Sequence, residues 1–133
     1  MYQTARAIGA YRNAQMTIPP LQVVVMLYDG ILARIARAAD AHRAHDYERQ
    51  FNEVMAAARI VDGLNRCLDL EAGGAVAAHL RSFYSTIAGE LLRSTGREYG
   101  APYLERLAVA VRVTRDAWAE IAGVSSNAES VQN

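Results

Sequence analysis

Histidine and cysteine are the residues of this sequence best suited to metal or covalent chemistry, and it contains three histidines and one cysteine. His42 and His45 are three residues apart, the spacing of a helical metal pair. A working site needs three or four converging ligands, and the Glu-x-x-His pattern of di-iron bundles does not occur here. We therefore expect no metal site. A cofactor-carrying bundle that uses His42 or Met26 is the less favoured alternative.

Nucleophilic and phosphate-binding chemistry has little support in the sequence. Cys67 has no histidine near it along the chain, and the acidic pair Asp69 and Glu71 is expected at a helix end, where solvation explains it. Gly73-Gly74 follows a predicted helix rather than a strand, so it does not read as a phosphate loop. All 14 basic residues are arginine, which excludes lysine chemistry. The sequence predicts no enzyme, no catalytic residue and no cofactor.

Four segments carry apolar residues at alternating spacings of three and four, which predicts amphipathic helices. The first should start at Thr17 and two prolines and run to about Arg43, because threonine caps helices and proline suits a first turn. The other expected boundaries are an Asp46 cap and a Gly73-Gly74 end for the second helix, a stop near Gly96 for the third, and Gly100 and Gly123 around the fourth.

Each predicted helix has one apolar face that should be buried. The residues on these faces are Val24, Leu27, Tyr28, Ile31, Ile35, Ala38 and His42; Tyr47, Phe51, Val54, Ala58, Val61, Asn65 and Leu68; Val76, Leu80, Phe83, Ile87 and Leu91; and Leu104, Leu107, Val111, Thr114, Trp118 and Ile121. Four such helices with short connections predict an all-α fold, an antiparallel four-helix bundle. We expect one domain, with a short helical N-terminal arm (1–16), the bundle (17–123) and a flexible tail (124–133).

The composition narrows the class of protein. The 133 residues are 52% hydrophobic and 21% charged, which is typical of a globular chain, and the net charge is +0. A neutral chain lacks the basic excess that nucleic-acid and membrane-surface binders need. The longest strongly apolar run, residues 21–28, is too short to span a bilayer, and the N-terminus shows no signal peptide. With a single cysteine, a reducing, cytoplasmic location is expected.

More apolar residues occur than one bundle face per helix can bury. The surplus positions are Val25, Met26, Ile60, Val109 and Val113. At about 100° per residue, Val109 and Val113 point away from the Leu104–Trp118 stripe of the last helix. Two interpretations carry equal weight on spacing alone. These are scattered surface hydrophobes, or they form a groove for an apolar peptide.

A set of motifs in fixed order resembles the flagellar secretion chaperone family, FliS. The matching residues are Pro20, Val23, Met26-Leu27-Tyr28-Asp29-Gly30, Leu64-Asn65, Leu68-Asp69, Gly73-Gly74, Ala77, Leu80, Tyr84 and Arg115-Asp116-Ala117-Trp118. They extend over most of the chain. The resemblance implies a cytoplasmic helical bundle, without catalysis, that binds the disordered C-terminal segment of flagellin. It also implies delivery of flagellin to the flagellar export gate.

The resemblance also gives the surplus residues a role in binding flagellin. Gly30 would let another segment approach closely, and Tyr28 offers an apolar ring with a hydroxyl, although core packing explains Tyr28 equally well. Asp29 is expected to bond to a neighbouring segment or to solvent rather than to a client. Tyr2, Ile8 and Tyr11 form an apolar patch in the arm, so residues 1–16 are expected to dock on the apolar start of the first helix and compete with the peptide. The competing hypothesis is a self-associating bundle, in which the apolar surplus forms a homodimer.

Overall fold

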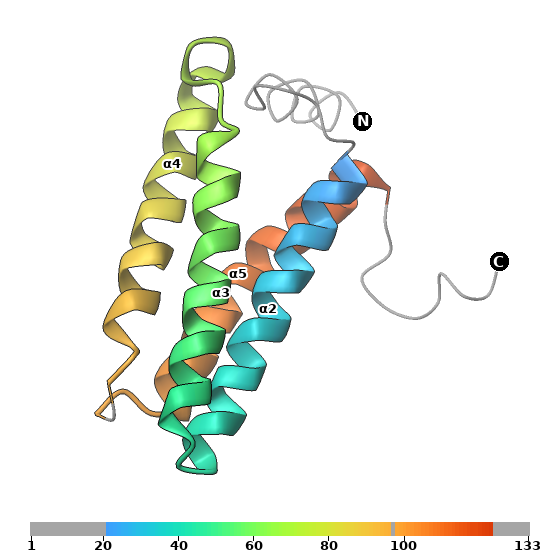
Figure 1. Ribbon diagram of the computed structural model, residues 1–133. Helices are drawn as coiled ribbons and strands as arrows, with labels where there is room; N and C mark the ends of the chain where they lie inside the picture. The colour runs from blue at the N-terminus through green and yellow to red at the C-terminus, as the bar shows by residue number, and fades with distance from the viewer. Residues whose placement is uncertain (1–20, 97, 124–133) are drawn as a thin grey trace, which may run out of the picture.

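Four α-helices make up the computed structural model, which describes residues 21–96 and 98–123 (Figure 1). They are α2 (Leu21–Arg43), α3 (Tyr47–Arg66), α4 (Leu70–Arg93) and α5 (Ala101–Ala122). Consecutive helices run in opposite directions, so the predicted antiparallel four-helix bundle is confirmed. The predicted arm and tail, the start at Thr17, and the candidate residues Ile8 and Tyr11 lie outside the described residues.

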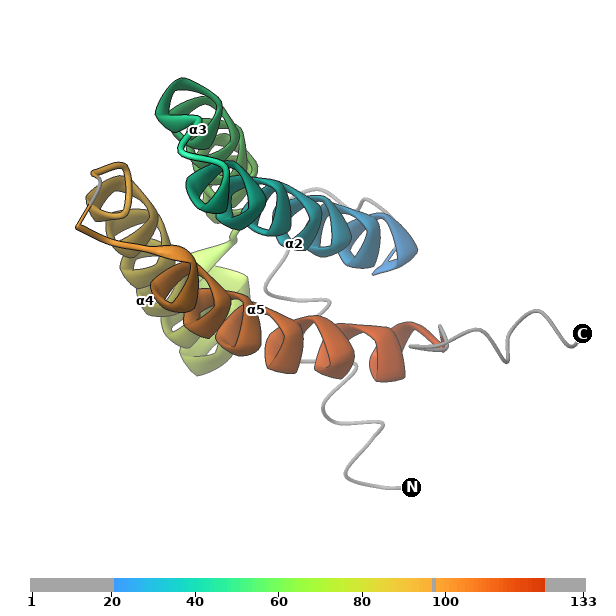
Figure 2. The same cartoon turned by 90° about the horizontal axis from the view of Figure 1, so that it is seen from below.

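The helices form two antiparallel pairs that do not pack evenly. α2 packs against both α3 and α5, and α3 packs against α4, whereas α4 and α5 meet over a much smaller area. α2 and α5 stay side by side and lean together away from the α3–α4 hairpin (Figures 1 and 2). The seam between α4 and α5 is therefore the most open of the four.

An aromatic cluster joins α2, α4 and α5. The Tyr28 ring centroid lies 6.2 Å from that of Tyr84 and 6.5 Å from that of Trp118. The Tyr28 and Tyr84 hydroxyls are hydrogen-bonded, with oxygens 2.8 Å apart. All three side chains are buried, as predicted for Trp118. Tyr28 of α2 thus links an aromatic residue of α4 to one of α5, two helices that pack little against each other.

The break between the second and third helices differs from the prediction. Gly73-Gly74 does not end the second helix, because α3 already stops at Arg66. Asp69 instead caps α4: its carboxylate accepts hydrogen bonds from the N–H groups of Glu71 and Ala72. Gly74, with φ 55° and ψ −133°, lies at a kink inside α4. Its left-handed φ is the conformation that glycine tolerates, but it serves a kink rather than a helix end.

The remaining boundaries agree closely with expectation. The Asp46 carboxylate accepts from the Arg49 N–H and caps α3, as predicted. Gly100 precedes α5, and Gly123 ends it in the left-handed conformation. The third helix stops at Arg93, three residues before the expected Gly96.

The assignment of two residues, Phe51 and Leu27, to the buried core is wrong. Phe51 is 48% exposed and Leu27 is 37% exposed. Both sit at the margin of a predicted apolar stripe, where spacing cannot tell whether a neighbouring helix covers the side chain.

Candidate functional site

The outer side of α5 carries two exposed valines one turn apart. Val109 is 58% and Val113 67% exposed, while Leu104 and Trp118 on the opposite side of the same helix are fully buried. The prediction that Val109 and Val113 lie outside the core is confirmed. We call these two residues the outer valine face.

A cleft opens between α4 and α5, next to this face. It has a volume of about 230 Å³ and is lined by Val76, His79, Leu80, Phe83 and Thr114. The cleft follows from the divergence of the two helices: Val76 and Phe83 were expected in the core but are only half-buried. No arginine or carboxylate lines it. This α4–α5 cleft is therefore suited to apolar side chains.

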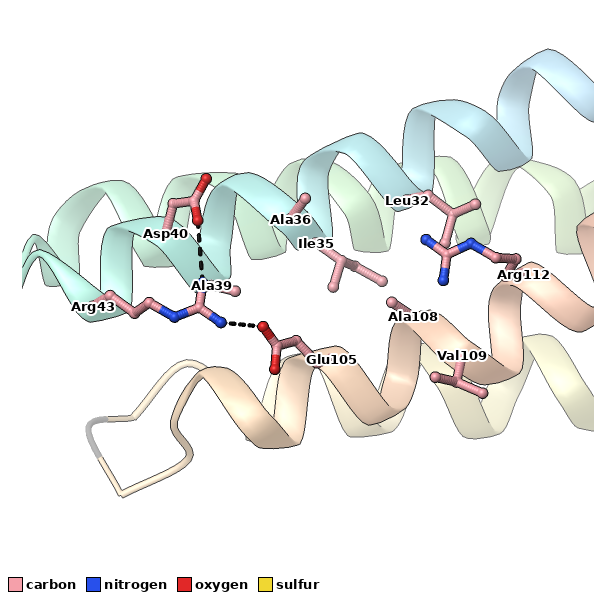
Figure 3. A pocket seen from close by; sticks show the side chains of 10 residues that line it. All are labelled: Leu32, Ile35, Ala36, Ala39, Asp40, Arg43, Glu105, Ala108, Val109 and Arg112. Atoms are coloured by element: carbon pink, nitrogen blue, oxygen red, sulfur yellow. Dashed lines mark hydrogen bonds and ion pairs between the residues drawn. The ribbon is translucent and has the colours of Figure 1, made fainter. Parts of the chain in front are cut away.

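A second cleft lies on the other side of α5, against α2, with a volume of about 330 Å³ (Figure 3). Its wall is made of small and aliphatic side chains, and its rim is charged. The lining residues are Leu32, Ile35, Ala36, Ala39, Asp40, Arg43, Glu105, Ala108, Val109 and Arg112. Val109 thus belongs both to this α2–α5 cleft and to the outer valine face. On the other side of the valine face, Thr114, which follows Val113 in α5, lines the α4–α5 cleft.

The charges on the rim of the α2–α5 cleft are not spread evenly. Arg43 bonds to Asp40 at 3.1 Å and also to Glu105 across the cleft. Arg112 lines the same cleft, one turn along α5 from Ala108, and no described residue gives it a hydrogen bond or an ion pair. At one end of the cleft the charge of Arg43 is therefore neutralised by carboxylates, whereas at the other end Arg112 has no carboxylate partner among the described residues.

The other surplus residues have different environments. Met26 is 67% exposed at the start of α2, as expected of a residue outside the core. Val25 is 2% exposed and belongs to the core cluster, so the interpretation that it is surplus to the core is wrong. Ile60 is half-buried, and its Cδ1 would lie 3.4 Å from a Cβ added at Gly30. Gly30 does allow a close approach, and the approaching segment is α3.

Tyr28 and Asp29 both make contacts within the bundle. Tyr28 is fully buried with a hydrogen-bonded hydroxyl, which matches the core interpretation. Asp29 accepts hydrogen bonds from the Arg115 guanidinium at 2.8 and 3.3 Å, which ties α2 to α5. Bonding to Asp29, opposed by burial, raises the pKa of Arg115. Arg115 therefore stays charged throughout the physiological range, and the expected contact of Asp29 with a neighbouring segment is confirmed.

Sequence reasoning missed the cleft residues. Val76, Leu80 and Phe83 have ordinary core spacing, and nothing in the sequence indicates that α5 diverges from them. His79 was expected at the surface; it is exposed and contributes to the α4–α5 cleft. Arg112 gave no signal, because an exposed arginine on a helix needs no explanation.

Metal ligands do not converge in the part of the chain that the structure describes: no three His, Cys, Asp or Glu side chains come together there. His42 instead packs near Gly100 and against the Tyr47 ring, with ring centroids 5.8 Å apart. His45 lies in the α2–α3 turn with φ 61°. Among the described helices, none combines the length and hydropathy needed to cross a membrane.

Comparison with known proteins gives a consistent result. The chain matches the family described as "Flagellar protein FliS" over residues 2–125. It is 30% identical to the flagellar secretion chaperone FliS of Salmonella typhimurium (strain LT2) over 133 residues, covering 96% of this chain and 98% of that protein. It is 32% identical to the flagellar secretion chaperone FliS of Campylobacter jejuni subsp. jejuni serotype O:6 over 120 residues, covering 90% and 93% of the two chains.

Proposed function

The chain belongs to the FliS family of flagellar secretion chaperones, and from that membership we propose that it binds the disordered C-terminal segment of flagellin before export. The client segment would lie over the outer valine face and enter the clefts on either side of α5. In this role the protein holds flagellin as a monomer in the cytoplasm and hands it to the flagellar export apparatus. The chemistry is binding alone, with no bond made or broken.

The observation that carries the proposal is the exposed apolar surface of α5 between two clefts. Val113 and Val109 are exposed between the α4–α5 cleft and the α2–α5 cleft. A disordered client loses conformational entropy when it binds, so it needs a large, mainly apolar partner surface. One cleft alone is small, whereas two clefts joined by an exposed face offer a path along which a chain can lie.

Holding a client monomeric follows from mass action. A flagellin segment covered by the chaperone is not available to other flagellin molecules, and each added chaperone molecule shifts the population toward the bound form. This requires a stoichiometric complex. It also requires that the chaperone does not cover the same surface with a second copy of itself.

The test is sedimentation of the full-length protein with intact flagellin and with flagellin that lacks its C-terminal region. We expect a one-to-one complex with intact flagellin and none with the truncated form. Equal binding of both forms would place the contact elsewhere in flagellin. A stable homodimer that does not bind flagellin would instead support the self-associating bundle, because the same exposed valines can form a dimer interface.

A further inference from the structure

We propose that the α2–α5 cleft is a charge-selective subsite in which Arg112 binds an acidic side chain of the client segment. This inference rests on the proposed function and adds to it a chemical requirement on the client. The bound segment should present an aliphatic side chain to the cleft wall, with an aspartate or glutamate within one turn of it. The acidic side chain then fixes which part of the client occupies this cleft.

The first argument is the distribution of charge along the cleft. At one end Asp40 and Glu105 share Arg43, so two carboxylates face a single guanidinium and the cluster keeps an excess negative charge. Arg112 stands seven residues beyond Glu105 on α5, about 10 Å along the helix axis. A client carboxylate is repelled from the first end and attracted to the second. The cleft therefore has a polarity that an uncharged groove lacks.

The second argument is the apolar wall beside Arg112. Figure 3 shows Leu32 on α2 and Ala108 on α5 close to the Arg112 side chain. The small side chains of Ala36 and Ala108 leave room for an incoming chain to approach the helix backbones. An ion pair that forms against apolar groups is less screened than one in open water, so a client carboxylate gains more here than on an ordinary surface.

The third argument is the contrast with the α4–α5 cleft. No arginine or carboxylate lines that cleft, and its only polar lining residues among those described are His79 and Thr114, so it selects mainly for shape and hydrophobicity. A purely apolar surface binds many sequences, and discrimination comes from polar groups that the wrong partner leaves unpaired. Arg112 is the cleft residue that supplies this discrimination, because the other charged residues of the α2–α5 cleft are already bonded to one another.

The experiment measures binding of a synthetic peptide, the C-terminal segment of flagellin from the same bacterium, by titration calorimetry. Arg112→Glu in the full-length protein should weaken binding by about tenfold, equivalent to about 1.4 kcal/mol. Arg112→Gln should weaken it less, because it removes the attraction without adding repulsion. The matched control is Arg37→Glu, which makes the same charge change at an exposed α2 residue outside the cleft lining and should leave affinity within about twofold.

Charge-swapped peptides make the test specific. Each acidic residue of the peptide is replaced in turn by arginine and measured against the parent protein and Arg112→Glu. One peptide variant should bind the parent protein poorly and recover on Arg112→Glu to within about threefold of the original affinity. The subsite proposal is overturned if Arg112→Glu binds the parent peptide normally, or if no swapped peptide recovers. Failure of the parent protein to bind the original peptide would instead overturn the proposed function.

Discussion

Replacing both residues of the outer valine face with aspartate separates binding from folding. Val109 and Val113 are 58% and 67% exposed in the free protein, so the carboxylates of Val109→Asp/Val113→Asp should remain hydrated and the bundle should keep its core. Both positions lie well inside α5, away from its termini, and valine and aspartate have similar helix propensity. Surface substitutions of this kind change stability by about 0.5 kcal/mol or less each. The helical content and melting temperature should therefore be close to those of the parent.

The loss of affinity follows from the same exposed fractions. Complete burial of a valine side chain contributes about 1.5 kcal/mol, so covering the exposed part of each one contributes about 0.9 kcal/mol, and nearly 2 kcal/mol for the pair. The double variant forfeits this contribution and must also desolvate two carboxylates or keep water in the interface. A loss of at least tenfold in affinity for the flagellin C-terminal peptide is expected, equivalent to about 1.4 kcal/mol.

Titration calorimetry with that peptide and thermal melting by circular dichroism measure the two effects separately. The matched control is Phe51→Asp/Leu92→Asp, which places two carboxylates at exposed apolar positions on α3 and α4 that line neither cleft. This control should bind normally. If the α5 double variant binds as well as the parent, the outer valine face is not the peptide site. If it unfolds, the valines have a structural role that their exposure does not reveal.

Three further predictions concern the core. Trp118→Ala should lower the free energy of unfolding by about 3–5 kcal/mol, measured by urea denaturation, because it removes a fully buried aromatic side chain; a loss below 1 kcal/mol would contradict its burial. Tyr28→Phe and Tyr84→Phe should each cost about 1 kcal/mol, and the double variant less than their sum, because both remove the same 2.8 Å hydrogen bond; strict additivity would refute that bond. Gly30→Ala should be neutral or stabilising by up to about 1 kcal/mol, whereas Gly30→Leu should destabilise by about 1–3 kcal/mol by pushing against Ile60; equal melting temperatures for the two variants would exclude the close approach.

The sequence predicted the helices better than it predicted their arrangement. Caps such as Asp46 and the C-terminal Gly123 depend on residues within a few positions of the helix end, so a local pattern identifies them. Asp69 was interpreted as a solvated acid because the glycine pair four residues later gave a stronger breaking signal. In the structure, the Asp69 side chain caps the start of α4, and Gly74 kinks this helix without ending it.

The candidate site likewise contains some residues that the sequence could place and others that it could not. Helical spacing alone placed Val109 and Val113 on the outside of the last helix, because a wheel needs no knowledge of neighbouring helices. The same spacing assigned Val25 to the surplus and Phe83 to the core, whereas Val25 is buried and Phe83 is half-buried. Both assignments depended on how much of each side chain a neighbouring helix covers. A cleft is a property of two diverging elements, so no spacing within one helix can indicate it.

The unequal packing of the helices offers a physical reason why a small bundle can expose apolar surface and keep a well-packed core. Two contacts hold α5 to α2: the buried Trp118 packs against the Tyr28 ring, and Arg115 is bonded to Asp29. With that anchor, the helix does not need close packing against α4 for its position, and the α4–α5 seam can stay open for a client. Charged residues such as Arg112 and Asp116 flank the exposed valines on α5 and limit the width of the apolar surface. The arrangement therefore favours a partner that supplies both an apolar stripe and a matching carboxylate over indiscriminate apolar contact.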